Sequence, residues 1–153
     1  MKSIQEDIKK QEFKPVYLLF GEEAYLRQQY KQMLLKALVP ENDTMNFSRY
    51  EGRKVEPRQI IDLAETMPFF ASKRVILLEN TGFFKNKCEE LAEYLKQVPD
   101  YLCMIFVETE VDKRGKMYKA AKAAGRVVEF SVQNSQMQML LKALVPENDT
   151  MNF

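Results

Sequence analysis

Short runs of apolar residues alternate with longer segments of helical periodicity along most of this sequence. Three runs, Val16–Phe20, Arg74–Leu78 and Tyr101–Val107, are nearly continuous in apolar residues, as are strands that are buried on both faces. The segments between them carry apolar residues at the i, i+3, i+4, i+7 spacing of an amphipathic helix. Strands that alternate with helices in this way form a parallel sheet covered on both sides. The sequence therefore predicts a three-layer α/β fold with about five parallel strands.

The element boundaries follow from the same periodicity and from the helix-breaking residues. The expected helices are 3–11, about 22–38, 57–67, 84–96 and 113–124, and the remaining strands are 47–50 and 127–130. Pro40 and Pro68 are expected to end the second and third helices, and Gly125 is expected to cap the last. The buried face of the third helix is expected to contain Ile60, Leu63, Ala64 and Met67.

Composition narrows the possible functions. A net charge of +1 gives no overall attraction to nucleic acid or to a membrane surface. The chain has no histidine, which removes the commonest general base and the commonest zinc ligand. Cys88 and Cys103 lack the spacing of a metal site, and no apolar run reaches membrane-spanning length. We therefore predict a cytoplasmic protein that needs neither a cofactor nor a metal, and the lack of histidine makes catalytic activity less expected.

Residues Gln138–Phe153 repeat Gln32–Phe47 without a single change. Natural repeat architectures diverge and recur several times, whereas this segment occurs twice and is identical. We interpret the second copy as a cloning artefact; a deliberate duplication and a sequence error are the alternatives. The expected domain is 1–137, and 138–153 is left out of the functional argument. We expect the copy to be disordered, or to dock on its own or a neighbouring molecule.

The turn after the first strand is the position where a nucleotide would bind in such a sheet. A phosphate-binding P-loop has a second glycine, a lysine and a hydroxyl residue at this turn. This sequence has Gly21, Glu22 and Glu23 there, and none of those groups follows up to Arg27. The two glutamates would repel phosphate, and they suit the N-terminal end of a helix dipole. We predict a degenerate P-loop that does not bind nucleotide.

Two further polar groups are weaker candidates. Glu79-Asn80 after the third strand only partly resembles the acidic pair that holds magnesium in active ATPases. The basic helix near residues 113–122 has lysines that share one face and could contact a phosphate backbone. The favoured interpretations are a strand that ends in polar residues and a solvated helix face.

The segment Met67-Pro68-Phe69-Phe70 contains two adjacent aromatic residues after a proline. Two neighbouring phenylalanines cannot both face inward from a regular helix. An exposed pair of this kind is typical of a hot spot that fills a partner's pocket. Burial of one phenylalanine contributes roughly 1.5–3 kcal/mol, so two would supply much of a micromolar affinity. From the residues alone, burial of both in the domain's own core remains the alternative.

Four segments resemble the N-terminal domain of the δ subunit of bacterial DNA polymerase III. They are Val16–Leu26 (VYLLFGEEAYL), Met67–Asn80 (MPFFASKRVILLEN), Asp112-Lys113-Arg114 and Gly125–Phe130 (GRVVEF). The resemblance covers about residues 1–130, and its motifs are specific only in combination. It implies a RecA/AAA+-like fold of the P-loop NTPase type that has lost its P-loop.

The resemblance also implies a function. Family δ subunits bind the ring-shaped β sliding clamp through a hydrophobic plug, and Met67, Phe69 and Phe70 match the plug by position. They then favour the open ring during DNA replication, without hydrolysing ATP. The family's other partners are the ATPase and δ′ subunits of the clamp loader, and DNA is contacted only by the assembled loader. A nucleotide-binding module and a nucleic-acid-binding module are the alternative functions.

Overall fold

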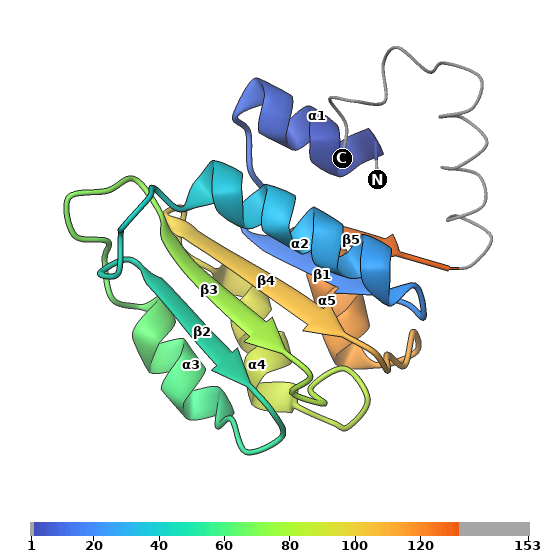
Figure 1. The fold of residues 1–153 in the computed structure, drawn as a ribbon. Helices are drawn as coiled ribbons and strands as arrows, with labels where there is room; N and C mark the ends of the chain where they lie inside the picture. The colour runs from blue at the N-terminus through green and yellow to red at the C-terminus, as the bar shows by residue number, and fades with distance from the viewer. Residues whose placement is uncertain (1, 132–153) are drawn as a thin grey trace, which may run out of the picture.

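The apolar runs form a five-stranded parallel sheet in the order β2-β3-β4-β1-β5 (Figure 1). The computed structural model describes residues 2–131. Its strands are β1 (Val16–Phe20), β2 (Phe47–Glu51), β3 (Arg74–Glu79), β4 (Leu102–Glu108) and β5 (Arg126–Glu129). The three central strands are buried along their whole length, as continuous apolar runs require. The predicted α/β class and the parallel sheet are confirmed.

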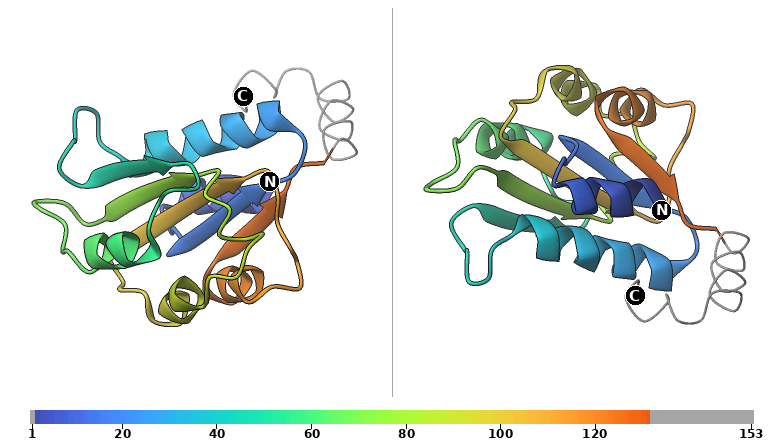
Figure 2. Two further views of the ribbon diagram at one scale, coloured as in Figure 1. Left: turned by 90° about the horizontal axis from the view of Figure 1, so that it is seen from below. Right: turned by 90° about the horizontal axis from the view of Figure 1, so that it is seen from above.

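Helices cover both faces of the sheet (Figure 2). One face carries α1 (Lys2–Lys10) and α2 (Ala24–Leu38), and the other carries α3 (Pro57–Ala64), α4 (Glu89–Tyr94) and α5 (Lys116–Ala124). A short 3-10 turn, Leu95–Gln97, extends α4. Alternate side chains of each central strand enter the two cores, so that Leu18 faces α3–α5 whereas Tyr17 and Leu19 face α1 and α2.

Three helices are shorter than the sequence predicts. The third helix, α3, ends at Ala64, and Met67 lies outside it, as expected for a residue that precedes proline and is disfavoured in helical backbone. The fourth, α4, begins only at Glu89, because the segment before it turns at Gly82 (φ +81°) and buries Phe84 edge-on against Phe106 at 5.0 Å. The fifth, α5, begins at Lys116 after a turn in which the Asp112 carboxylate accepts the Arg114 amide.

The repeated segment 138–153 lies outside the described residues, and so does our expectation for it. Within residues 2–131, no helix combines the length and the apolar character that crossing a bilayer requires.

A buried polar cluster ties α1 to the sheet. The two carboxylate oxygens of Asp7 accept hydrogen bonds from Nε and Nη2 of Arg126 at 2.7 and 2.8 Å. The hydroxyl of Tyr17 also donates to Asp7, at 2.7 Å. Burial alone would raise the pKa of Asp7, but these hydrogen bonds lower it overall. Asp7 therefore connects the N-terminal helix to β1 and β5 as an ionised carboxylate.

Replacing Asp7 by asparagine is expected to lower the free energy of unfolding by about 2 kcal/mol at pH 7. The folded-state pKa of Asp7 is lowered, so its contribution is present above the unfolded pKa and is lost as pH falls through the folded pKa. The difference between wild type and Asp7→Asn should therefore shrink below about pH 4. Urea denaturation at several pH values measures it. Asp62→Asn, at an exposed ion pair with Arg58, is the control and should change stability little. A difference that stays constant with pH would contradict this account of Asp7.

Candidate functional site

The loop between α3 and β3 exposes three large apolar side chains. Met67 is 72% exposed, Phe69 54% and Phe70 94%. The rings of Phe69 and Phe70 lie edge to face with their centroids 4.4 Å apart. The phenylalanine pair is therefore exposed, as one of the two sequence interpretations required. The expectation that Met67 belongs to a buried helix face is wrong, because Met67 lies beyond the end of α3 and its side chain is exposed.

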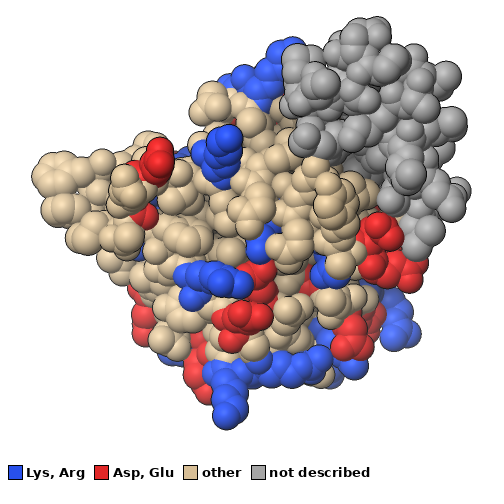
Figure 3. All heavy atoms as spheres, in the orientation of Figure 1, with Lys and Arg blue, Asp and Glu red and all other residues tan. Residues whose placement is uncertain are grey.

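This loop lies at the edge of the sheet where the parallel strands begin (Figure 1). Residue Arg74 opens β3, and Asn46 immediately precedes β2, which pairs with β3. In the same orientation, this end of the molecule projects and consists mainly of uncharged side chains (Figure 3). The candidate site is therefore at the opposite edge from the strand ends where α/β sheets usually bind nucleotides.

The side chain of Asn46 holds the centre of the loop. Its Nδ2 donates to the carbonyl oxygen of Phe69 at 2.8 Å, and its Oδ1 accepts the amide of Phe69. The same Nδ2 donates to Asp43 at 3.1 Å. Since Asn46 is only 5% exposed, these hydrogen bonds replace water that cannot reach the group.

The side chain of Arg74 holds the start of the loop. Its Nε donates to the carbonyl oxygen of Thr66 at 2.6 Å, and its Nη2 donates to that of Met67 at 3.2 Å. Arg74 is buried, so its guanidinium fixes two carbonyl groups that a longer helix would have satisfied internally. Two buried side chains thus fix the backbone from which the apolar residues project.

Phe70 has a left-handed backbone conformation, with φ of +53°. A bulky residue other than glycine rarely adopts it, and only surroundings that determine the backbone maintain it. The Phe70 ring contacts the Phe69 ring but is 94% exposed, so packing in a core does not hold this conformation. The strain is instead offset by the hydrogen bonds to the neighbouring Phe69.

Sequence reasoning found the three apolar residues but missed Asn46 and Arg74. It also missed Met45, which is exposed beside Asn46 in the preceding loop. The Asp-Thr-Met-Asn order is typical of a turn closed by an aspartate side chain, and Asp43 does accept the amides of Met45 and Asn46. The Asp-Thr-Met-Asn order therefore predicts a turn at this place. It does not predict that Asn46 hydrogen-bonds to the loop that contains Phe69.

The turn at Gly21, Glu22 and Glu23 is closed by the chain that follows β5. The amide of Glu23 donates to the carbonyl oxygen of Phe130 at 3.0 Å, and the amide of Phe130 donates to Phe20 at 2.7 Å. A Cβ on Gly21 would lie 2.7 Å from the nitrogen of Phe130. This contact packs the turn closely against Phe130 and engages the amide of Glu23 within the chain, which favours our prediction that no phosphate group binds here.

Glu79 at the end of β3 is fully engaged by two basic side chains. Its carboxylate accepts Nζ of Lys31 at 3.0 Å and Nε of Arg49 at 2.7 Å. Burial would raise the pKa of Glu79, but these two partners lower it overall. Both oxygens already have a cationic partner, which favours the structural interpretation of Glu79-Asn80 over a magnesium site.

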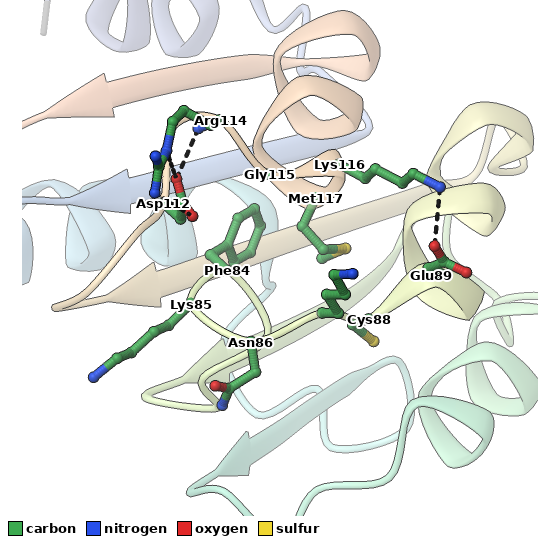
Figure 4. Close-up of a pocket in the computed structure, with 11 residues that line it drawn as sticks. Phe84, Lys85, Asn86, Cys88, Glu89, Asp112, Arg114, Gly115, Lys116 and Met117 are labelled. Carbon is green, nitrogen blue, oxygen red and sulfur yellow. Dashed lines mark hydrogen bonds and ion pairs between the residues drawn. The ribbon is translucent and has the colours of Figure 1, made fainter.

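A cavity of ≈ 500 Å³ lies between the segment before α4 and the start of α5 (Figure 4). Three of the basic side chains that line it are paired with acidic ones: Lys116 with Glu89 at 2.9 Å, Arg114 with Asp112 at 3.2 Å and Lys85 with Glu110 at 2.8 Å. Lys113 outside the cavity also pairs with Glu129, at 2.7 Å. This pairing reduces the positive potential that a phosphate backbone would need. It favours the solvated-face interpretation of the basic helix.

The fold and the loop together define a class of protein: a three-layer RecA/AAA+-like domain with an exposed apolar projection at the edge away from the usual nucleotide site. The family model described as "DNA polymerase III, delta subunit" matches residues 17–131. The chain therefore belongs to the DNA polymerase III delta subunit family. The resemblance of the four sequence segments is confirmed.

Comparison with individual proteins agrees with this assignment. The chain is 28% identical over 145 residues to DNA polymerase III subunit delta of Bacillus subtilis, covering 87% of this chain and 42% of that protein. It superposes on the structure of a Bacillus subtilis DNA clamp loader delta protein with a TM-score of 0.76 and 25% identity, covering 85% of this chain and 42% of the other. The chain thus spans less than half the length of these relatives.

A second solved structure shares the fold alone. A DNA polymerase III gamma subunit-related protein of Thermotoga maritima superposes with a TM-score of 0.58 at 12% identity, covering 93% of this chain and 49% of that one. Architecture of this kind is thus common to proteins of quite different sequence.

Proposed function

We propose that this chain is the clamp-binding part of a clamp loader δ subunit, which binds the β sliding clamp through Met67, Phe69 and Phe70. The exposed phenylalanine pair on a loop held by Asn46 and Arg74 carries the proposal. Two aromatic rings on a fixed backbone bury a large apolar area at little entropic cost. Such a projection suits insertion into a hydrophobic pocket.

In this proposal the chain helps to open the ring and catalyses no reaction. Binding favours the open ring only if the chain binds the open form more tightly than the closed form. The similarity to longer relatives, one of which is described as a clamp loader protein, supports this proposal. In a full-length protein we expect the ATPase and δ′ subunits as further partners, DNA contact through the assembled loader, no membrane association and a cytoplasmic location.

The test is titration of the full chain onto purified β clamp from the same organism, followed by biolayer interferometry. Saturable binding in the micromolar range, about 8 kcal/mol, is expected, and the two buried phenylalanines supply roughly 3–6 kcal/mol of it. A clamp whose hydrophobic partner pocket is blocked by a competing peptide should not bind. Failure of the unblocked clamp to bind, up to about millimolar concentration, would reject the proposal.

The turn at Gly21–Glu23 supports the absence of nucleotide binding in the proposed function. The amide of Glu23 donates a hydrogen bond to the carbonyl oxygen of Phe130, and the carboxylates of Glu22 and Glu23 would repel phosphate. We expect the melting temperature to stay unchanged in excess ATP–magnesium. A ligand at 100 times its dissociation constant would add about 2.7 kcal/mol of stability, which is easily measured. A clear upward shift would restore the nucleotide-binding alternative.

A further inference from the structure

The amide of Asn46 has one orientation in this structure, and Asp43 determines it. Asp43 accepts Nδ2 of Asn46 and the backbone amides of Met45 and Asn46 at 3.0–3.1 Å. Hydrogen bonds from Asn46 lower the pKa of Asp43, so it is a carboxylate and only accepts hydrogen bonds. Nδ2 must therefore face Asp43, which leaves Oδ1 free to accept the amide of Phe69.

The Asn46 side chain hydrogen-bonds to both the amide and the carbonyl group of Phe69, in the way that the backbone of a neighbouring strand would. The sheet itself does not require this contact. The backbone carbonyl of Asn46 already accepts the amide of Val75 at 2.9 Å and so begins the β2–β3 pairing without the side chain. The side chain is thus available for a separate role, and that role is to hold Phe69.

Loss of this contact would release the loop. Phe70 has φ of +53° and an almost fully exposed ring that contacts the neighbouring Phe69 ring, so neither its backbone preference nor packing in a core keeps it in place. A released loop would move its apolar side chains into other conformations, and only a fraction would match the partner's pocket. Apparent affinity falls in proportion to that fraction.

We propose that Asn46, oriented by Asp43, is a positioning residue that presents Phe69 and Phe70 to the clamp. This inference rests on the proposed function, and it assigns part of the affinity to a residue that need not touch the partner. It predicts a contribution from preorganisation that is separate from the area of contact.

The test combines clamp titration with amide hydrogen exchange for the variant Asn46→Ala. Affinity is expected to fall about tenfold, and exchange at the amide of Phe69 to accelerate about tenfold or more. In the Phe69→Ala/Phe70→Ala background, Asn46→Ala should cause no further loss of affinity, because it acts only through those rings. An equal loss in both backgrounds would overturn the proposal.

A second variant separates positioning from general stability. Asn46→Asp keeps an acceptor for the amide of Phe69 but places two carboxylates about 3 Å apart. Adding Asp43→Asn removes that repulsion and supplies a donor, so the double variant should bind the clamp more tightly than Asn46→Asp alone. Asp7→Asn is the matched control, because it destabilises the domain at a distant site and should leave affinity unchanged. If Asn46→Ala does not fold, this pair still decides the proposal.

The outcomes distinguish the two proposals. If wild type binds and the phenylalanine double variant binds about 100-fold more weakly, the proposed function holds. Wild-type affinity in a folded Asn46→Ala then rejects the role of Asn46 alone. If wild type does not bind the clamp, the function and the positioning role both fall. If Asn46→Asp and its double variant bind equally weakly, Asp43 does not orient the amide.

Discussion

Replacing Phe69 and Phe70 together by alanine is expected to weaken clamp binding by about 100-fold or more and to leave the fold intact. Each phenylalanine contributes roughly 1.5–3 kcal/mol on burial, and about 2.7 kcal/mol corresponds to 100-fold in affinity. Both side chains are more than half exposed in the free chain, so their removal opens no cavity in either core. The loss should therefore appear in the dissociation rate and not in the melting temperature.

Tyr25→Ala is the matched control for this double variant. Tyr25 is 72% exposed, a value between those of Phe69 and Phe70, but it is at the start of α2. That position is at the opposite edge of the sheet from the α3–β3 loop (Figure 1). If any exposed aromatic side chain contributed to binding nonspecifically, Tyr25→Ala and the phenylalanine double variant would both weaken binding. Equal affinity of wild type and the phenylalanine double variant would place the interface elsewhere on the domain.

Much of the fold could be predicted from the sequence because the central strands are buried on both faces. The run Val16–Phe20 matches β1 at both ends, since nothing but continuous apolar character is needed to define such a strand. Helix ends were less predictable because tertiary contacts decide them. Phe84 lies at a helical position in the sequence pattern, yet packing against Phe106 draws it into a turn.

The candidate site divides in the same way. A proline followed by two phenylalanines identified the segment, but the residues alone left open whether the pair is exposed or buried, and the structure shows that both are exposed. The contacts that fix them are not local: Asn46 and Phe69 are 23 residues apart in the chain. Only the pairing of β2 with β3 brings the two loops together. One sequence without relatives to compare contains no signal for such a contact.

Gly21→Ala is expected to destabilise the domain by about 3–5 kcal/mol, the largest stability effect among these variants. Gly21 has φ of +115°, a conformation that an alanine adopts only with strain. In addition, a Cβ would overlap the carbonyl oxygen of Phe130 and lie 2.7 Å from its nitrogen. Phe130 would have to move, which would break its backbone hydrogen bonds to Phe20 and Glu23. Chemical denaturation of both proteins measures the difference.

Gly52→Ala separates the two causes of that loss. Gly52 also has a positive φ, of +98°, but a Cβ there meets nothing within 4 Å. It should therefore cost only the backbone strain, about 1–2 kcal/mol, and the excess in Gly21→Ala measures the contact with Phe130. Equal effects would mean that Phe130 is not packed against the turn and that the turn has room for a phosphate group. An excess of about 2 kcal/mol would mean that Gly21 is needed for the close backbone packing of this turn against Phe130.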